Sequence, residues 1–196
     1  NYRTVSLISH PNKVMLNIIL NRLKPQAEKI IAEEQADFRA GRSTTEQIFN
    51  QRILCEKYLQ HQQDLYHVFI VFKKAFDRVW RAALWATMKK YISTNLIQVV
   101  KNLYNKATSA VLFNSSIGGW FRTTVGVRQG YLLSPTLFNI FLQRIMTDAL
   151  ENHEGAVSTG GRTITNLRFA DDIDGSAGEE EELANLVERL DKASTA

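Results

Sequence analysis

Two adjacent carboxylates near the end of the chain are the residues best suited to chemistry. Asp171 and Asp172 stand in NLRFADDIDG, residues 166–175, where an apolar, strand-like run stops at the pair. Neighbouring like charges raise each other's pKa, so the pair needs solvent, hydrogen-bond donors or a cation to stay ionised. A metal ion is the most specific of these three partners.

Three interpretations of the pair are open. Aspartates are common at turns, because their side chains accept hydrogen bonds from nearby backbone N–H groups. The spacing also approaches a calcium-binding EF-hand loop, but the first ligand place is Ala170 and a strand pattern precedes it where an EF-hand needs a helix. The third interpretation is a magnesium pair at the tip of a β-hairpin, used for phosphoryl or nucleotidyl transfer.

A magnesium pair of this kind needs a further carboxylate from a neighbouring strand. Two hard cations about 4 Å apart demand oxygen ligands, and two carboxylates from one turn seldom suffice. The place to look is the end of LYHVFIVF, residues 65–72, a continuous run of aromatic and β-branched residues. That pattern predicts a strand in the middle of a sheet, covered on both faces.

Other elements must hold these strands in place. Ser43 and Glu46 form a capping box that opens a helix, with Ile48, Cys55 and Leu59 as its inner face. A single cysteine excludes an internal disulfide, and its helical apolar setting favours an ordinary buried thiol over a nucleophile.

A second helix and a hairpin precede the acidic pair. Ser134 and Pro135 start the helix, and Gly160-Gly161 marks the turn of the hairpin. The buried face of that helix is predicted to consist of Phe138, Leu142, Ile145 and Ala149.

Charge is distributed unevenly along the 196 residues. Residues 1–168 carry 22 Lys/Arg and 11 Asp/Glu, a net +11, whereas residues 169–196 carry 2 and 9, a net −7. A basic body favours a polyanionic partner such as nucleic acid, although a solvated surface gives the same pattern. No apolar run is long enough for a membrane span, and the chain, without an initiator Met, is expected to be part of a longer protein.

Five segments resemble motifs of one family, the reverse transcriptases of non-LTR retrotransposons. NYRTVSLIS is similar to the family's NYRPISLLS, QADFRAGRSTTEQIF to QAGFRxGRxTxDQIF, VFIVFKKAFDRVW to VFIDFKKAFDRVW and VRQGYLLSP to VRQGCLLSP, while FADD is unchanged. Any one segment is suggestive. Five in the same order, over nearly the whole chain, are highly specific.

The resemblance implies an α+β fold, the right-hand polymerase, in which fingers precede an antiparallel palm sheet backed by helices. Residues 1–62 would form part of the fingers and residues 63–196 the palm, with a fingers insertion around 93–127. The thumb and the endonuclease domain would lie outside this chain.

Carried over position by position, Asp171 and Asp172 match the family's metal-binding pair. Phe76 matches the bulky gate beneath the sugar that excludes a 2′-hydroxyl, although a buried aromatic at a strand end gives the same pattern. Gln129 and Gly130 match the loop that contacts the incoming nucleotide.

Three arginines also match family positions. Arg3 would clamp the triphosphate, and Arg39 and Arg42 would line the template path. Taken without the motif, each is a surface cation.

One departure from the family affects the metal site directly. The bridging aspartate of VFIDFKKAFD is replaced here by Val71, which offers no oxygen, and Asp77, at the start of the next helix, is not expected to substitute. Polymerisation should therefore fall by orders of magnitude. The fold need not suffer, because valine favours strands and removes a charge that would repel the pair.

Two other departures lie in motif loops. Asp37 stands for the glycine of QAGF, where template phosphates are expected, and Tyr131 stands for the cysteine of RQGC, where it is expected to add bulk beside the nucleotide loop.

The resemblance implies an RNA-directed DNA polymerase that uses Mg²⁺, an RNA template, a DNA primer and deoxynucleoside triphosphates, without a membrane partner. An intracellular location is expected, and the nucleus for an intact element. The alternative is a non-catalytic nucleic-acid-binding remnant or a domesticated interaction module.

Overall fold

The protein, described by a computed structural model over residues 5–105, 107–153, 155, 157–159 and 161–195, forms two compact units. The helical unit combines the segment up to Ile30 with Lys74–Phe141, and the sheet unit combines Ile31–Lys73 with Leu142–Ala196. Each unit therefore joins segments that are far apart in the sequence.

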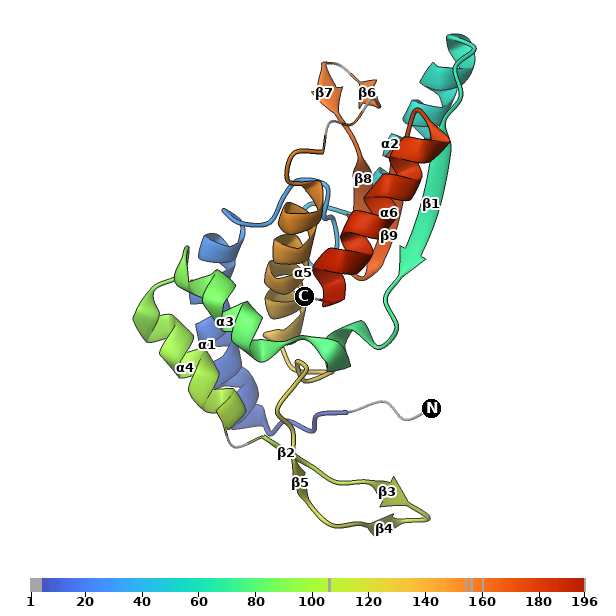
Figure 1. The fold of residues 1–196 in the computed structure, drawn as a ribbon. Helices are drawn as coiled ribbons and strands as arrows, with labels where there is room; N and C mark the ends of the chain where they lie inside the picture. Colours follow the sequence, from blue (N-terminus) through green and yellow to red (C-terminus); the bar gives the residue numbers. More distant parts are fainter. Residues whose placement is uncertain (1–4, 106, 154, 156, 160, 196) are drawn as a thin grey trace. The chain divides into compact units, whose positions relative to one another are not determined.

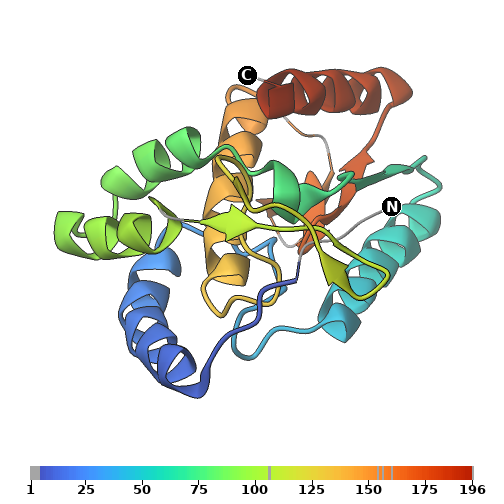
Figure 2. The same cartoon turned by 90° about the horizontal axis from the view of Figure 1, so that it is seen from below.

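Helices form most of the helical unit. In both Figure 1 and Figure 2, α4 lies beside α1 and α3. Leu16, Ile19 and Leu23 form the buried stripe of α1, at the three- and four-residue spacing of a helix face. The elements of this unit are α1 (His10–Ala27), η1 (Ala75–Arg78), α3 (Arg81–Lys89), α4 (Thr94–Asn105) and the first half of α5 (Ser134–Leu150).

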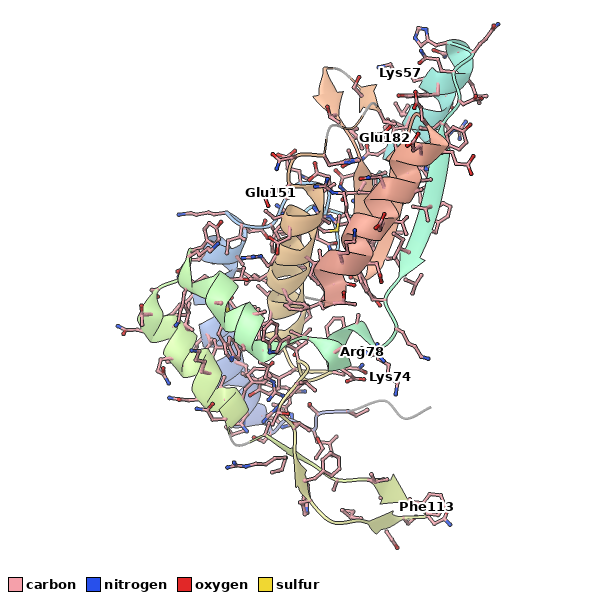
Figure 3. All side chains as sticks on the ribbon, viewed as in Figure 1. Lys57, Lys74, Arg78, Phe113, Glu151 and Glu182 are labelled. Atoms are coloured by element: carbon pink, nitrogen blue, oxygen red, sulfur yellow. The ribbon has the colours of Figure 1, made fainter. Side chains whose placement is uncertain are left out.

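Short hairpin strands complete the helical unit. β2 (Thr108–Ser109) pairs with β5 (Phe121–Arg122), and β3 (Leu112–Phe113) pairs with β4 (Ser116–Ile117), all antiparallel. Figure 3 shows Phe113 near the outer end of the β3–β4 hairpin, where its side chain is exposed.

A three-stranded antiparallel sheet forms the centre of the other unit. Its order is β1 (Tyr66–Val71), β9 (Asp172–Ala177) and β8 (Asn166–Phe169). The antiparallel prediction is confirmed, but the prediction that β1 lies mid-sheet and is covered on both faces is wrong. Within the described residues β1 is an edge strand, and Phe69 and Val71 are each 69% exposed. The apolar run reflects strand propensity here more than burial.

Helices pack on both faces of the sheet. On one face, α6 (Glu180–Thr195) lies along β9 and β1, as Figure 1 shows. A Cβ atom at Gly175 would lie 3.0 Å from Val68 and 3.3 Å from Leu186, so the absence of a side chain at residue 175 permits this close packing. On the other face, Cys55 of α2 (Thr44–Gln60) contacts His67 of β1.

The cap of α2 is confirmed, but its predicted inner face is not. Ser43 accepts a hydrogen bond from the backbone N–H of Glu46 at 3.2 Å. Ile48 and Leu59, however, are 61% and 75% exposed, and Leu54 is the residue of α2 that is fully buried. The helix carries more than one apolar stripe, and its packing against β8 covers a narrow one.

The predictions for α5 and the glycine hairpin are confirmed. Phe138, Leu142, Ile145 and Ala149 of α5 are all buried. β6 (Ser158–Thr159) pairs with β7 (Arg162–Thr163), as the hairpin prediction requires. Gly161 has a φ of 78°, and Gly160 lies outside the described residues. No helix in the described part of the chain is long and apolar enough to cross a membrane.

Candidate active site

The acidic pair lies where β8 turns into β9. Phe169 pairs with Asp172 across the hairpin, which leaves Ala170 and Asp171 as a two-residue turn. Ala170 has a φ of 54°, in the left-handed region that residues with a Cβ rarely adopt, and turns joining two adjacent antiparallel strands often require it at this place. A hairpin turn therefore carries the pair, in place of an EF-hand loop.

The register of β1 against β9 brings Val71 directly opposite Asp172. Directly opposed residues of antiparallel strands project to the same face, with Cβ atoms about 4.5–5.5 Å apart. Val71 is 69% exposed, and Asp172 is exposed as well. The position that lacks an oxygen ligand is therefore adjacent to the acidic pair, as the sequence comparison with the family motif predicted.

This donor set fits a divalent cation only in part. Asp171 and Asp172 supply the hard oxygen ligands that Mg²⁺ prefers, while Val71 supplies a hydrocarbon on the same face. Across the described residues there is no group of three or more His, Cys, Asp or Glu side chains placed to hold a metal ion.

Asp37 adds a further carboxylate near the turn. Burial raises the pKa of Asp37, the N–H of Phe38 opposes this shift, and repulsion by Asp171 adds to it. Its own N–H donates to the side-chain oxygen of Gln35 at 3.1 Å. Asp37 therefore contributes negative charge beside Asp171.

The two arginines predicted to line a template path lie in the same unit, and both are half-buried. Arg39 donates to the backbone oxygens of Ala32 at 2.7 Å and Gln35 at 3.1 Å. Arg42 pairs with Glu46 at 2.8 Å along the first turn of α2. Both guanidinium groups thus have structural partners, and their role toward a template stays a prediction.

The predicted nucleotide-contacting residues belong to the helical unit. Phe76 is half-buried and stacks on Phe138 with ring centroids 4.7 Å apart, and its carbonyl accepts from Val127 N–H at 2.7 Å. The carbonyl of Gln129 accepts from Ser6 N–H at 3.0 Å.

Gly130 follows in the same loop with a φ of 81°, a conformation that favours glycine. Arg3, the predicted triphosphate clamp, lies outside the described residues. The roles predicted for all four residues toward a nucleotide stay predictions.

Arg81 anchors the segment before this loop, and sequence reasoning did not find it. Its guanidinium donates to the carbonyls of Thr123 at 2.6 Å, Gly126 at 2.8 Å and Val125 at 3.0 Å. Three charge-assisted bonds to one short segment hold the backbone that leads into Gln129. No local signal in the sequence marks such a contact, because the partners are more than 40 positions apart.

Tyr131 lies differently from the prediction. Its ring is 7% exposed, packs edge-on against Tyr104 at 6.2 Å, and has the Arg128 guanidinium 5.2 Å above it. Burial raises the pKa of Tyr131, and the positive charge of Arg128 opposes this shift. The bulk added at this position enters the core of the helical unit, since an aromatic ring gains more from burial than from exposure.

A polar cluster on the face of β1 was also missed. His67 Nδ1 lies 3.0 Å from Asp174 Oδ1 and 3.2 Å from Ser176 Oγ, and His67 Nε2 lies 3.6 Å from Cys55 Sγ. Burial raises the pKa of Asp174, and the hydrogen bond from His67 opposes this shift. Cys55 is half-buried, and its thiol is hydrogen-bonded to an imidazole rather than packed among apolar groups alone.

Comparison with known sequences gives the family. The family model described as reverse transcriptase (RNA-dependent DNA polymerase) matches residues 1–195. The RNA-directed DNA polymerase from mobile element jockey of Drosophila funebris is 27% identical over 175 residues, 88% of this chain and 19% of that protein. The probable RNA-directed DNA polymerase from transposon X-element of Drosophila melanogaster is 30% identical over 177 residues, 88% of this chain and 18% of that protein. The chain thus spans less than a fifth of the length of these relatives.

Solved structures support the fold. The structure of apo telomerase from Candida tropicalis, truncated from its C-terminal domain, matches with a TM-score of 0.61 and 19% identity, over 94% of this chain and 38% of that one. Telomerase from Candida albicans, in complex with a TWJ fragment of telomeric RNA, matches with a TM-score of 0.61 and 12% identity, over 92% of this chain and 32% of that one. The α+β polymerase core is therefore confirmed, and the chain belongs to the reverse transcriptase family, as a domain of the kind found in the RNA-directed DNA polymerases of non-LTR retrotransposons.

Proposed function

We propose that this domain belongs to an RNA-directed DNA polymerase whose metal centre is incomplete, so that nucleotidyl transfer is impaired while the fold is intact. The observation that carries the proposal is the pairing of Val71 with Asp172 on one face of the sheet. In the family the position of Val71 provides a carboxylate. Here the developing charge on phosphorus would meet two carboxylates and a hydrocarbon in place of a complete two-ion centre.

The remaining site residues have roles that do not depend on the lost ligand. We assign Phe76 to the exclusion of a 2′-hydroxyl, Gln129 and Gly130 to the contact with the incoming nucleotide, and Arg3 to its triphosphate. The aromatic stacking of Phe76 on Phe138 gives a rigid ring suited to a steric gate. Mg²⁺, the cation expected of the family, would be held by Asp171 and Asp172, and more weakly than by three carboxylates.

Nucleic-acid binding is the activity most expected to persist. The net +11 of residues 1–168 favours phosphate contacts, and Arg39 and Arg42 are assigned to the template path. An RNA template, a DNA primer and deoxynucleoside triphosphates are the proposed partners.

The nucleus is the proposed location of an intact element, and residues 1–62 and 63–196 are the proposed fingers and palm. A non-catalytic nucleic-acid-binding remnant is the second candidate function, favoured by the same valine.

Primer extension separates the two candidates. We would place residues 1–196 in the corresponding position of the jockey polymerase, so that the missing parts of a complete enzyme are supplied, and compare the unaltered segment with Val71→Asp and Val71→Asn. Extension above background for Val71→Asp alone supports an impaired polymerase. Robust extension by the unaltered segment would refute the proposal. Salt-sensitive primer-template binding by all three proteins, without extension by any, would favour the binding remnant.

A further inference from the structure

A buried glutamine lies beside the strand that leads into the acidic turn. Gln35 is 1% exposed, and its backbone forms a parallel bridge with Arg168 of β8. Ala36 N–H donates to the carbonyl of Arg168 at 3.0 Å, and Arg168 N–H donates to the carbonyl of Glu34 at 2.9 Å. The segment 34–36 therefore runs along β8 toward the turn.

The side-chain amide of Gln35 binds Ala170 in the turn through both its nitrogen and its oxygen. Its Nε2 donates to the carbonyl of Ala170 at 3.1 Å, and its Oε1 accepts from the N–H of Ala170 at 3.1 Å. The same Oε1 accepts from the N–H of Asp37 at 3.1 Å. A carboxamide can donate to and accept from one residue at once while remaining neutral.

The residue held in this way has an unfavourable backbone conformation. An alanine at a φ of 54° carries a conformational cost relative to the right-handed region, because its Cβ lies close to the following carbonyl oxygen. Two hydrogen bonds to the buried Gln35 side chain help to offset that cost, because they pair both the N–H and the carbonyl of Ala170. Ala170 precedes Asp171 directly, so the backbone conformation of Ala170 determines how the next two residues, Asp171 and Asp172, are oriented.

We infer that Gln35 is a positioning residue for Asp171 and Asp172. By fixing both backbone polar groups of Ala170, it holds the two carboxylates in one orientation relative to β1 and so preorganises the cation-binding position. The inference rests on the proposed function for its consequence in metal binding. It does not rest on that function for its structural content, which is the restraint of the turn.

Gln47 provides a matched control. Its Nε2 donates to the carbonyls of Glu34 at 2.7 Å and Arg168 at 3.0 Å. Gln47 therefore also binds the segment 34–36 and β8, but it makes these bonds before the turn and not at Ala170. A merely structural role for Gln35 predicts that Gln35→Met and Gln47→Met have the same consequences at the acidic pair. A positioning role predicts a difference.

The first measurement is amide hydrogen exchange by NMR in the otherwise unaltered chain. Gln35→Met should accelerate exchange at Ala170, Asp171 and Asp172, whereas Gln47→Met should leave the exchange rates of these three amides within about twofold of the parent when global stability is matched with urea. Equal acceleration in both variants, or none in Gln35→Met, would overturn the inference. This readout involves no metal ion and is independent of the proposed function.

The second measurement is Mn²⁺ affinity, by electron paramagnetic resonance, in chains carrying Val71→Asp. Adding Gln35→Met should weaken Mn²⁺ binding by about tenfold or more, the usual effect of losing a group that orients metal ligands, and adding Gln47→Met should not. Equal affinities in the two double variants would count against the inference. If Val71→Asp binds Mn²⁺ no better than Val71→Asn, the proposed metal site fails instead, and the exchange measurement alone decides the role of Gln35.

A second substitution separates stability from position. Ala170→Gly removes the cost of the positive φ and should restore folding to a chain destabilised by Gln35→Met. The glycine cannot restore the lost hydrogen bonds, so the acidic pair should remain mobile and Mn²⁺ binding weak. Recovery of both stability and Mn²⁺ affinity would show that Gln35 acts on stability alone.

Discussion

Replacing Val71 by aspartate should destabilise the sheet unit before any effect on catalysis is considered. The new carboxylate would face Asp172 across the strand pair at a separation of about 5 Å. At that distance, two charges in a water-like dielectric repel by about 0.8 kcal/mol, and by about 3 kcal/mol at an effective dielectric of 20. Because both positions are exposed, we expect a value near 1 kcal/mol.

The matched control is Val71→Asn, which loses the same β-branched side chain without adding charge. Each substitution should cost about 1 kcal/mol in strand preference, so the difference between them isolates the repulsion. Urea denaturation at about 10 mM salt should give the aspartate variant a free energy of unfolding about 1 kcal/mol below that of the asparagine variant, and the gap should shrink toward zero in 1 M salt. Millimolar Mg²⁺ should also close the gap if the carboxylates share the cation.

Two results would contradict this reasoning. A gap that is absent at low salt means that residue 71 does not project toward Asp172, and then the account of the missing ligand fails. A gap that persists in 1 M salt means that its origin is not electrostatic. Neither result depends on the rest of a polymerase being present, because both strands belong to the sheet unit.

Three other substitutions test contacts around the site. Gly175→Ala should lower the free energy of unfolding in urea by about 1–3 kcal/mol, since the new Cβ would lie 3.0 Å from Val68. An unchanged urea midpoint would show that the space around residue 175 is large enough for a methyl group. His67→Phe should lower the free energy of unfolding in urea by about 1–3 kcal/mol, because it leaves Asp174 without its hydrogen-bond partner, and an unchanged stability would show that this bond contributes nothing. Arg81→Met should lower the free energy of unfolding by about 1–3 kcal/mol and should accelerate amide exchange over residues 123–126. Unchanged exchange there would mean that the three bonds to carbonyls do not restrain this segment.

The parts of the fold that the sequence predicted are those with local signals. Ser43 caps α2 through a bond within one turn, and Ser134 begins α5, so short stretches of sequence suffice for both. The hairpin tip was predictable because an apolar run stops at Asp171. The strand that follows the tip, β9, pairs with the strand before it, β8, since neighbouring strands in sequence need the shortest connection.

The parts that the sequence did not predict depend on distant partners. The edge position of β1 depends on which strands lie beside it, and its apolar run is equally compatible with a central place. Gln35 reaches a residue 135 positions later, and His67 reaches one 107 positions later. Hydrogen bonds of such separation leave no periodic pattern, because any residue type that the fold brings near can supply the partner.

A valine at position 71 and preservation of the fold are compatible for a physical reason. The hydrogen bonds that pair β1 with β9 are made by backbone N–H and C=O groups, which valine supplies as well as aspartate does. The turn is set by the contacts of Gln35 with Ala170, which do not involve residue 71. A side chain at position 71 therefore changes the ligands available to a cation without changing where the other two carboxylates lie. Repair should accordingly need one substitution and no adjustment of the backbone.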